Sequence, residues 1–309
     1  MPAPRNGIAT DAPVDLELMA EVVHKTWNEL KTKNRTIAVA IDQSYVFTRV
    51  LEMPQMSDFE LTSSINWEAE EYIPLPLNQM RLEWQVMNRR VNENGEKRMD
   101  VLLVAVPKAL IDKYHKIFEL AHLDLKILEP ECISIMRTMN LFNLGGKLNV
   151  VVNFGDKKTD ILVNSAGAIS FVRTVPTGGR ALTRAISQGL NLPEDQAENY
   201  KTAYGFDKTK INGAIFNILQ PVFNVILDEI KRAVIFQQNK EPSKALNTLV
   251  ICGAGSNLPD VNVVLSNALN LEVITADPFA VIKSKTQNAK SSTSNQKFLI
   301  AVGLAMNII

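Results

Sequence analysis

Residues 148–180 constrain the fold of this chain more than any other stretch. Three apolar runs, at residues 150–154, at residues 160–163 and after Gly167, are separated by two short polar turns. Runs of apolar residues bounded by Gly and polar residues indicate strands joined by tight turns. A Thr-Gly-Gly sequence then leads into a helical stretch at residues 181–190. The sequence therefore predicts a three-stranded antiparallel meander followed directly by a helix.

The same stretch offers two places where an anion can bind. The turn at residues 155–158 presents backbone N–H groups, which form anion sites in such turns. Gly178 and Gly179 open the predicted helix, and a helix N-terminus attracts negative charge. A phosphate held between the two places is one interpretation. The other is an ordinary hairpin followed by a helix cap, which this stretch alone favours slightly.

Composition narrows the classes of function. A length of 309 residues suggests about two domains. The 33 Lys and Arg residues balance 33 Asp and Glu residues, which argues against a nucleic-acid binder that works by phosphate neutralisation. Cys132 and Cys252 lie in apolar surroundings without the spacing of a metal site, so we expect reduced core cysteines. The longest apolar run, residues 298–309, is shorter than the roughly 20 residues that cross a bilayer. Any membrane role is therefore expected to come through a partner.

The first half of the chain alternates helices and strands. Ser57 and Glu60 form a capping-box pattern at a helix start, and Asn94-Gly95 is a strong signal for a hairpin turn. The expected helices cover residues 14–31, 57–72, 107–121 and 132–142, and the expected strands cover residues 36–41, 45–51, 81–91, 97–106 and 126–128. In this interpretation, residues 82–106 and their flanking helices form a small α+β unit.

The second half continues with helices and a second strand-to-helix turn. Pro221 predicts a kink or break in a long amphipathic helix at residues 211–238. The other expected elements are helices at residues 181–190, 194–203, 258–269 and 298–307, and strands at residues 248–252 and 271–274. The Gly-rich turn at residues 253–257 is a third close approach of the backbone to a ligand. One such turn is weak evidence, but three in this order favour a nucleotide clamp.

The order of these elements resembles the actin-like ATPase superfamily. Within it, the sequence INWEAEEYIPLPL at residues 65–77 is similar to a segment of the inserted subdomain 1C. This segment is typical of the branch that contains the type IV pilus assembly protein PilM and the cell-division protein FtsA. Further matches lie in family order and extend over nearly the whole chain, at residues 175–179, 197–201, 204–205, 252–258 and 301–305.

The resemblance implies an α/β, actin-like (ribonuclease H-like) two-domain fold. It has an inserted α+β subdomain 1C and a first domain that is N-terminally incomplete. The implied domains are residues 1–44 as the remainder of subdomain 1A, 45–126 as subdomain 1C, 127–147 as the return to 1A, 148–287 as the second domain with subdomain 2B helices around 206–240, and 288–309 as a C-terminal helix that returns to 1A.

One family motif is not found in the sequence. The first hairpin of the family carries phosphate loop 1, a D-I-G-x-x-x-x-K-like segment. This chain instead has Asn6-Gly7-Ile8 near its start, which resembles the linker behind that hairpin. Either the reading frame starts too late, or the chain has lost half of its phosphate clamp. A sheet without those strands would expose an edge, so we favour the late start. Translation upstream of Met1 in frame would decide between the two.

The resemblance also implies a nucleotide site. Phosphate loop 2, usually D-I-G, reads Asn153-Phe154-Gly155 in this chain, with Thr159 beyond it. Mg²⁺ prefers hard oxygen ligands and keeps much of its water. Asn153 can accept a hydrogen bond from such water but carries no charge. Asp156 is a candidate substitute, although Asp is also common in turns for backbone reasons.

The remaining implied site residues lie on later segments. Glu198 and Lys201 resemble a pair that contacts ribose and adenine, or they are ordinary charged residues on an exposed helix face. The other positions are Gly178 and Gly179 at the second phosphate contact, and Gly253, Gly255, Ser256 and Asn257 in the adenosine loop. The implied cofactor is ATP, with Mg²⁺ left open, and the absence of phosphate loop 1 is expected to weaken its binding.

Three functions are compatible with this fold. The favoured one is a cytoplasmic scaffold of type IV pilus assembly, peripheral to the inner membrane. It would bind the cytoplasmic tail of a PilN-like inner-membrane protein in a groove near residues 16–27, residues 36–41 and the 1C segment, with weak or structural ATP binding. The alternatives are an active ATPase of a pilus or type II secretion machine, and a small-molecule kinase.

His24, His115 and His122 share no motif, and no catalytic base is recognisable. Other pilus inner-membrane components are implied partners, nucleic acid is not, and self-association is left open.

Overall fold

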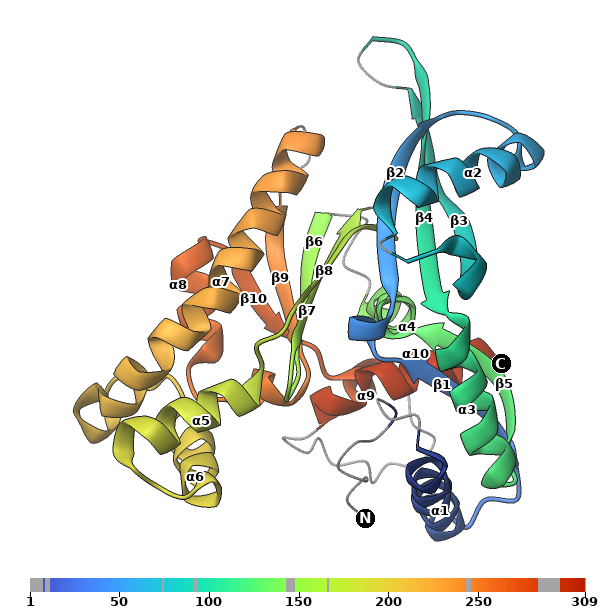
Figure 1. Cartoon of the computed structure of the whole chain (residues 1–309). Coiled ribbons are helices and arrows are strands. Elements are labelled where there is room, and N and C mark those ends of the chain that lie inside the picture. Colours follow the sequence, from blue (N-terminus) through green and yellow to red (C-terminus); the bar gives the residue numbers. More distant parts are fainter. Residues whose placement is uncertain are drawn as a thin grey trace. The chain divides into compact units, whose positions relative to one another are not determined.

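The computed structural model describes residues 8, 12–73, 75–91, 94–142, 148–165, 167–242, 246–282 and 295–308 (Figure 1). The chain divides into two compact units. Unit 1 comprises Met1–Glu131 with Ile308–Ile309, and unit 2 comprises Cys132–Asn307. The linker-like residues 6–7 and most of the loop at the start of the predicted segment 288–309 lie outside the described residues. The subdomain boundaries implied by the resemblance stay predictions.

Unit 1 contains two sheets. Its elements are α1 (Pro13–Glu29), β1 (Thr36–Ile41), β2 (Phe47–Pro54), α2 (Asp58–Tyr72), β3 (Met80–Val91), β4 (Lys97–Pro107), α3 (Lys108–Leu120) and β5 (Asp124–Pro130). Strands β2, β4 and β3 form an antiparallel sheet in that order, and β1 pairs with β5 in parallel. The predicted helices and strands of this unit are confirmed, with ends that differ by a few residues.

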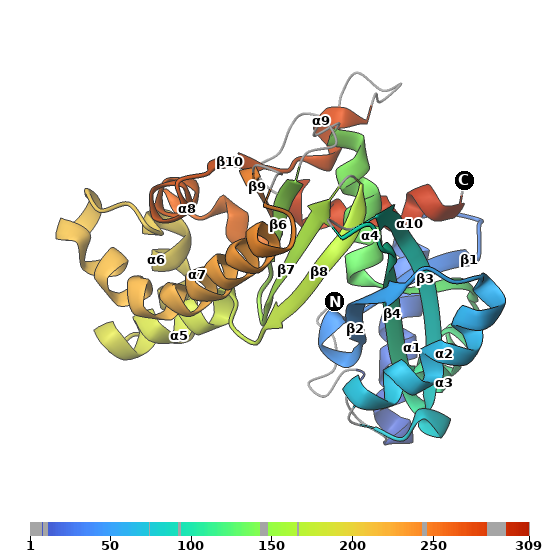
Figure 2. The ribbon, with the colours of Figure 1, turned by 90° about the horizontal axis from the view of Figure 1, so that it is seen from above.

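Helix α2 shows how local sequence signals set an element. Ser57 Oγ accepts a hydrogen bond from Glu60 N–H at 3.3 Å, and Glu60 Oε2 accepts one from Ser57 N–H at 2.8 Å. This reciprocal capping box satisfies N–H groups that the helix itself leaves unpaired. Leu61, Ile65 and Ala69 recur every four residues and are fully buried. They pack with apolar residues of β2 and β4, so α2 lies across one face of the three-stranded sheet (Figure 2).

Unit 2 is built on a five-stranded sheet. Its elements are α4 (Glu131–Met139), β6 (Leu148–Phe154), β7 (Thr159–Ser165), β8 (Ala168–Val175), α5 (Gly179–Leu190), α6 (Glu194–Tyr204), α7 (Ala214–Lys240), β9 (Leu246–Cys252), α8 (Val261–Leu269), β10 (Glu272–Thr275), α9 (Pro278–Val281) and α10 (Leu299–Ile308). The strand order is β10-β9-β6-β7-β8, in which β6, β7 and β8 are the antiparallel meander that we predicted. Strands β9 and β10 run parallel to β6.

The main core of unit 2 lies on one face of this sheet. Val150, Val152 and Phe154 of β6 alternate in sequence and point to the same face, as the period of two in a strand requires. Buried residues of α5, α7 and α8 join them in one cluster. Figure 2 shows α5 and α7 side by side along this part of the unit. The intervening residue Asn153 therefore points to the opposite face of the sheet.

Helix α7 departs from the prediction in two ways. Pro221 lies inside it, yet the helix runs unbroken from Ala214 to Lys240. Of the predicted kink or break, the break is wrong, because buried residues on both sides of the proline, such as Leu219 and Phe223, hold the helix against the core. The kink stays a prediction. The helix also starts later than predicted, since Ile211 and Asn212 adopt left-handed backbone angles.

The same helix is the part of the described chain that has the length and composition of a membrane span. The stretch Lys210–Lys240 is long and apolar enough, and 39% of its most apolar window is buried inside the protein. Its apolar face belongs to the core of unit 2. We therefore interpret it as a core helix.

Helix α8 begins at Val261, three residues later than predicted. Leu258 has extended backbone angles, which suits the residue before a proline because the ring of Pro259 disfavours the helical region there. Residues Ala254–Asn257 form a short 3₁₀ turn instead. The predicted Gly-rich turn is therefore real, but it is separated from the helix that follows.

Helices α4 and α10 contact each other closely at Gly303. A Cβ atom added to Gly303 would lie 2.0 Å from Ser134 O. Arg137 donates to Gly303 O at 2.7 Å, and Thr138 Oγ1 donates to Leu299 O at 2.9 Å. Residues far apart in sequence are thus joined by backbone proximity that only glycine permits.

We expect Gly303→Ala to destabilise the protein by about 3 kcal/mol, because the added methyl group has no space unless the two helices separate. Urea unfolding followed by circular dichroism measures this loss. Ala301→Gly, at an exposed position of the same helix, is the matched control and is expected to cost about 1 kcal/mol. Equal stability of Gly303→Ala and the unmodified protein would contradict the close packing of α4 and α10.

Candidate functional site

The twelve predicted site residues all lie in unit 2, and the structure brings their segments together. The hairpin between β6 and β7 meets the start of α5, where Gly179 N–H donates to Gly155 O at 2.9 Å. The turn after β9 meets the same hairpin, since a Cβ on Gly253 would lie 2.6 Å from Phe154 O. Helix α6 joins through Lys201, whose Nζ donates to Gly179 O at 3.1 Å. Three turns and one helix therefore converge at the end of β6.

The start of α5 packs closely on the backbone of the hairpin. A Cβ on Gly178 would lie 2.6 Å from Asp156 O, so only glycine fits there. The N–H groups of Gly179 and Arg180 donate to Gly155 O and Asp156 O at 2.9 and 2.8 Å. Hairpin carbonyls thus satisfy helix N–H groups that a capping side chain or an anion often satisfies. Because these donors are already used, a phosphate would need other N–H groups. Direct phosphate contact by the two glycines stays a prediction.

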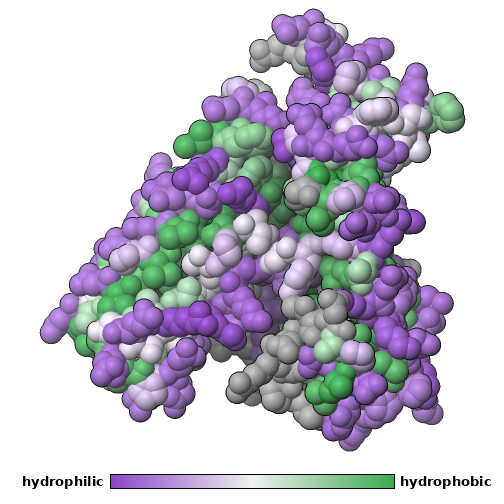
Figure 3. Space-filling view, in the orientation of Figure 1, coloured by the Kyte–Doolittle hydropathy of each residue, from purple (hydrophilic) through white to green (hydrophobic). Residues whose placement is uncertain are grey.

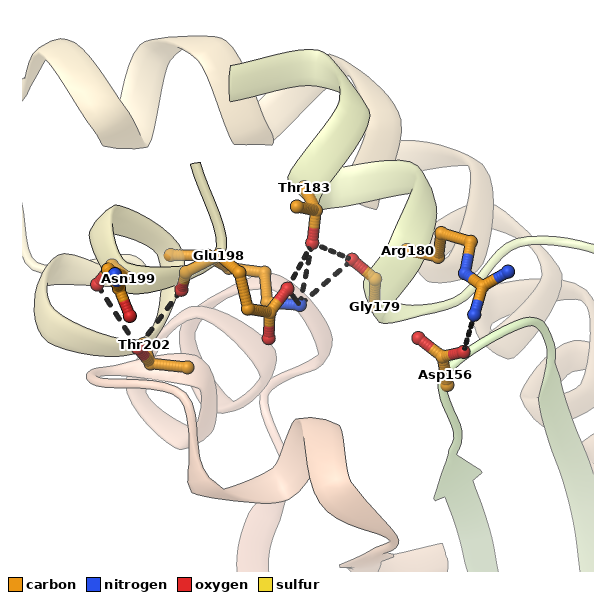
Figure 4. Close-up of polar contacts among 8 residues, drawn as sticks. Asp156, Gly179, Arg180, Thr183, Glu198, Asn199 and Thr202 are labelled. Atoms are coloured by element: carbon orange, nitrogen blue, oxygen red, sulfur yellow. Dashed lines mark hydrogen bonds and ion pairs between the residues drawn. The ribbon is translucent and has the colours of Figure 1, made fainter. Parts of the chain in front are cut away.

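Asp156 points outward and pairs with a cation of the same chain. Arg180 Nη2 lies 3.0 Å from Asp156 Oδ2, and the two side chains are 49% and 57% exposed (Figure 4). An exposed pair of this kind contributes about 0–1 kcal/mol. Its role as a substitute for the family aspartate stays a prediction.

Lys201 is buried, although one interpretation of the sequence placed it on an exposed helix face. Only 5% of this residue is exposed, and its Nζ donates to Gly179 O, Thr183 Oγ1 and Glu198 Oε2 at 3.1, 2.9 and 2.7 Å. An ammonium group has three donors, and all three are used. The side chain therefore joins α6 to the first turn of α5, and contact with a ribose or adenine would require one of these bonds to break.

Glu198 is half-exposed and shares this network. Figure 4 shows its carboxylate beside Thr183, which donates to it, and close to Gly179. Burial opposes ionisation of the Glu198 carboxyl, but the hydrogen bonds from Lys201 and Thr183 and the charge of Lys201 outweigh it and lower its pKa. Glu198 is thus held as an anion next to the helix start.

The Gly-rich turn after β9 is packed on the hairpin. Gly253 has a φ of 82°, and a Cβ on Gly255 would lie 2.4 Å from the Phe154 ring, so both positions require glycine. Ser256 Oγ donates to Gly253 O at 2.7 Å, whereas Asn257 is exposed. In this conformation Asn257 is the polar side chain of the turn that is accessible to a ligand.

Asp160 is the residue that the sequence analysis missed. It is 1% exposed and faces Asn153 on the neighbouring strand β6 and Thr174 on β8. Thr174 Oγ1, Lys158 Nζ and Asn153 Nδ2 lie 2.7, 3.2 and 3.4 Å from its carboxylate. The available signal was a carboxylate directly before the apolar residues Ile161–Val163 of a buried strand, since such a buried charge needs partners.

The environment of Asp160 also determines the state of Cys252. This thiol is fully buried beside Asn153. Burial and the negative charge of Asp160 raise the pKa of Cys252. It therefore stays protonated and is a core residue, as predicted, with no nucleophilic character.

These side chains do not fit a directly bound divalent metal. The Asp160 carboxylate is surrounded by an amide, a hydroxyl and an ammonium donor, whereas Mg²⁺ requires oxygen acceptors. Lys158 already supplies a positive charge in this place. Among the described residues, no group of three or more His, Cys, Asp or Glu side chains is arranged to hold a metal ion.

The chain is similar to known proteins over its whole length. The family model described as "Type IV pilus assembly protein PilM" matches residues 1–309. The cell division protein FtsA of Neisseria meningitidis serogroup B (strain ATCC BAA-335 / MC58) is 28% identical over 154 residues, which are 41% of this chain and 36% of that protein. The chain therefore matches about a third of the length of this curated relative.

Two solved structures show the fold. A chain of the "PilM-PilN type IV pilus biogenesis complex" has a TM-score of 0.83 and 19% identity, with 99% of this chain and 89% of that chain covered. MreB5 of Spiroplasma citri bound to ADP has a TM-score of 0.50 and 10% identity, with 94% and 74% covered. The fold is actin-like, as the sequence analysis predicted.

The lowered pKa of Glu198 predicts a pH-dependent contribution to stability. Its ionised form stabilises the fold above the ordinary pKa of 4.5, and this contribution is lost as the pH falls through the lower pKa of the folded state. We expect Glu198→Gln to be less stable than the unmodified protein at pH 7, by about 1 kcal/mol. The difference is expected to shrink below pH 4.5.

Unfolding in urea at several pH values measures this difference. Glu194→Gln, at an exposed position of the same helix, is the control and is expected to differ little from the unmodified protein throughout. A difference for Glu198→Gln that stays constant from neutral to strongly acidic pH would show that its charge does not stabilise the fold.

Proposed function

This chain belongs to the family of type IV pilus assembly protein PilM, and on that premise we propose that it is a cytoplasmic, actin-like scaffold of a pilus assembly machine. The match of the family over residues 1–309 is the observation that carries the proposal. The scaffold would lie against the inner membrane through its partners. Those partners are a PilN-like inner-membrane protein and other inner-membrane components of the pilus.

Binding of a PilN-like tail is supported by the similarity to a chain of the PilM-PilN complex and by unit 1 itself. Strand β1 pairs with β5, and these two strands form a sheet of two among the described residues. A two-stranded sheet leaves backbone groups at its edges, to which an extended peptide can add as a further strand. Half-buried apolar residues of α1, including Leu16, Val23 and Trp27, pack in the same cluster as β1. We propose that the tail binds along this part of unit 1.

The test is isothermal titration of the full chain with a synthetic peptide of the cytoplasmic tail from the neighbouring pilus gene. We expect micromolar binding and no binding of a scrambled peptide. Trp27→Ala, which removes a half-buried indole from the proposed groove, should weaken binding at least tenfold. Phe236→Ala removes a half-exposed aromatic ring from α7 in unit 2 and is the control. Equal affinities for the native and the scrambled peptide would contradict this part of the proposal.

For the nucleotide, we propose weak or structural binding with little turnover. The turns that converge at the end of β6 support a nucleotide site in unit 2. The internal hydrogen bonds of Gly179, Arg180 and Lys201, however, use donors that a phosphate or ribose would need. The donors around Asp160 leave no direct place for Mg²⁺. The alternatives for this chain are an active ATPase of a pilus or type II secretion machine and a small-molecule kinase.

Titration of the protein with ATP, in Mg²⁺ and in EDTA, separates these functions. We expect similar weak affinities in both buffers and no sustained release of phosphate. Asn257→Ala, in the exposed residue of the Gly-rich turn, should weaken binding further, whereas Asn267→Ala on the exposed face of α8 should not. Sustained phosphate release would favour the ATPase, and phosphorylation of an added sugar would favour the kinase.

A further inference from the structure

Helix α2 exposes two aromatic side chains that the proposed tail site does not use. Phe59 is 84% exposed and Trp67 is 79% exposed, the highest values among the large apolar side chains of the described residues. They are eight residues apart on one helix, which is about 12 Å along its axis. Both lie away from Leu61 and Ile65, which face the sheet.

This exposure is not explained by packing within the chain. The buried face of α2 is already formed by small and aliphatic residues, and neither aromatic ring belongs to the cluster beneath the helix. Polar residues would serve equally well at two positions that face solvent. Two large aromatic rings exposed on one helix are a candidate interaction site. The exposed rings of Phe59 and Trp67 are therefore a candidate binding surface for a partner protein.

Carboxylates surround the two rings. Helix α2 contains five acidic residues and no Lys, Arg or His. Asp58 pairs with Arg89 at 3.2 Å, but Glu70 and Glu71 are exposed on the same side as Trp67. Glu60 is exposed as well, and the hydrogen bonds from Ser57 keep its pKa below the ordinary value, so it stays ionised. The exposed surface of α2 thus carries both aromatic rings and carboxylates. We call Phe59, Glu60, Trp67, Glu70 and Glu71 the α2 stripe.

We propose that the α2 stripe docks a basic segment that carries an apolar anchor, of the kind found on the cytoplasmic side of a membrane-spanning helix. Lys and Arg pair with the carboxylates and stack on the rings, and the anchor covers the aromatic faces. The same helix provides an internal example, since the guanidinium of Arg49 lies 3.7 Å from the centre of the Tyr72 ring.

The source of the segment rests on the proposed function, which places the chain beside the inner membrane. Cytoplasmic loops next to membrane helices carry an excess of Lys and Arg. A partner in that membrane would therefore present such a segment to a cytoplasmic scaffold. The complementary charge of the α2 stripe does not depend on that assignment.

The test uses the full chain and a fluorescein-labelled 14-residue peptide made of Leu, Lys and Arg, followed by fluorescence anisotropy. A peptide with Glu in place of every Lys and Arg is the charge control. We expect Phe59→Ser with Trp67→Ser to weaken binding at least tenfold. Glu70→Gln with Glu71→Gln should weaken it at least threefold and reduce its dependence on salt. All four positions are exposed, so these variants are expected to fold, which circular dichroism checks.

Matched variants in unit 2 control for general effects of charge and hydrophobicity. Figure 3 shows apolar surface over the region of α7, where Val225 and Ile235 are 50% and 56% exposed. Val225→Ser with Ile235→Ser on α7, and Asp195→Asn on α6 with Asp228→Asn on α7, should leave binding within twofold of the unmodified protein.

Three results would overturn the inference. The first is equal binding by all variants, and the second is equal binding of the acidic peptide. The third is self-association of the chain in size-exclusion chromatography that Phe59→Ser with Trp67→Ser abolishes, since the α2 stripe would then bind a second copy. Trp27→Ala, in the proposed tail site, should leave binding of the basic peptide within twofold of the unmodified protein. Loss of tail binding in the unmodified protein would instead count against the proposed function and not against the α2 stripe.

Discussion

The contact between the β6–β7 hairpin and the start of α5 determines the rest of unit 2. Gly178 and Gly179 bring the helix so close that its first N–H groups bond to hairpin carbonyls, which fixes where α5 starts and how it leaves the sheet. Helix α6 is then joined to the same place through the buried ammonium of Lys201. The Gly-rich turn after β9 packs on Phe154, at the end of β6. The segments of the candidate site therefore all meet at the end of β6 and at the hairpin that follows it.

The same contact limits the chemistry of the site. Donors that an anion would use are satisfied within the chain, and the buried Asp160 is neutralised by Lys158. A site that satisfies its own polar groups loses little by lacking a ligand, because the N–H groups of Gly179 and Arg180 and the ammonium of Lys201 already have partners within the chain. Such a site is consistent with a scaffold whose shape matters more than turnover.

In unit 1, helix α2 has a different role on each of its two faces. The buried face of α2 stabilises the sheet through aliphatic residues, and its capping box is formed by neighbours in sequence. Its exposed face carries aromatic and acidic side chains that contribute nothing to that packing. The buried face of α2 therefore stabilises the sheet, and its exposed face is the one that the proposed partner would contact. A change on the exposed face can alter binding without unfolding the unit.

The sequence by itself determined the elements and the family. Turn glycines, the apolar runs of the meander and the capping box at Ser57 are local signals, so the meander and α2 could be predicted. The actin-like fold followed from the resemblance of residues 65–77 and the other matching segments to one family. Only the tertiary structure decided that Lys201 is buried, that Pro221 does not break α7, and that Asp160 meets Lys158 and Asn153. These outcomes depend on which side chains from distant segments compete for the same donors and the same space. That competition exists only once the strands and helices have packed, because local sequence sets conformation but not partners.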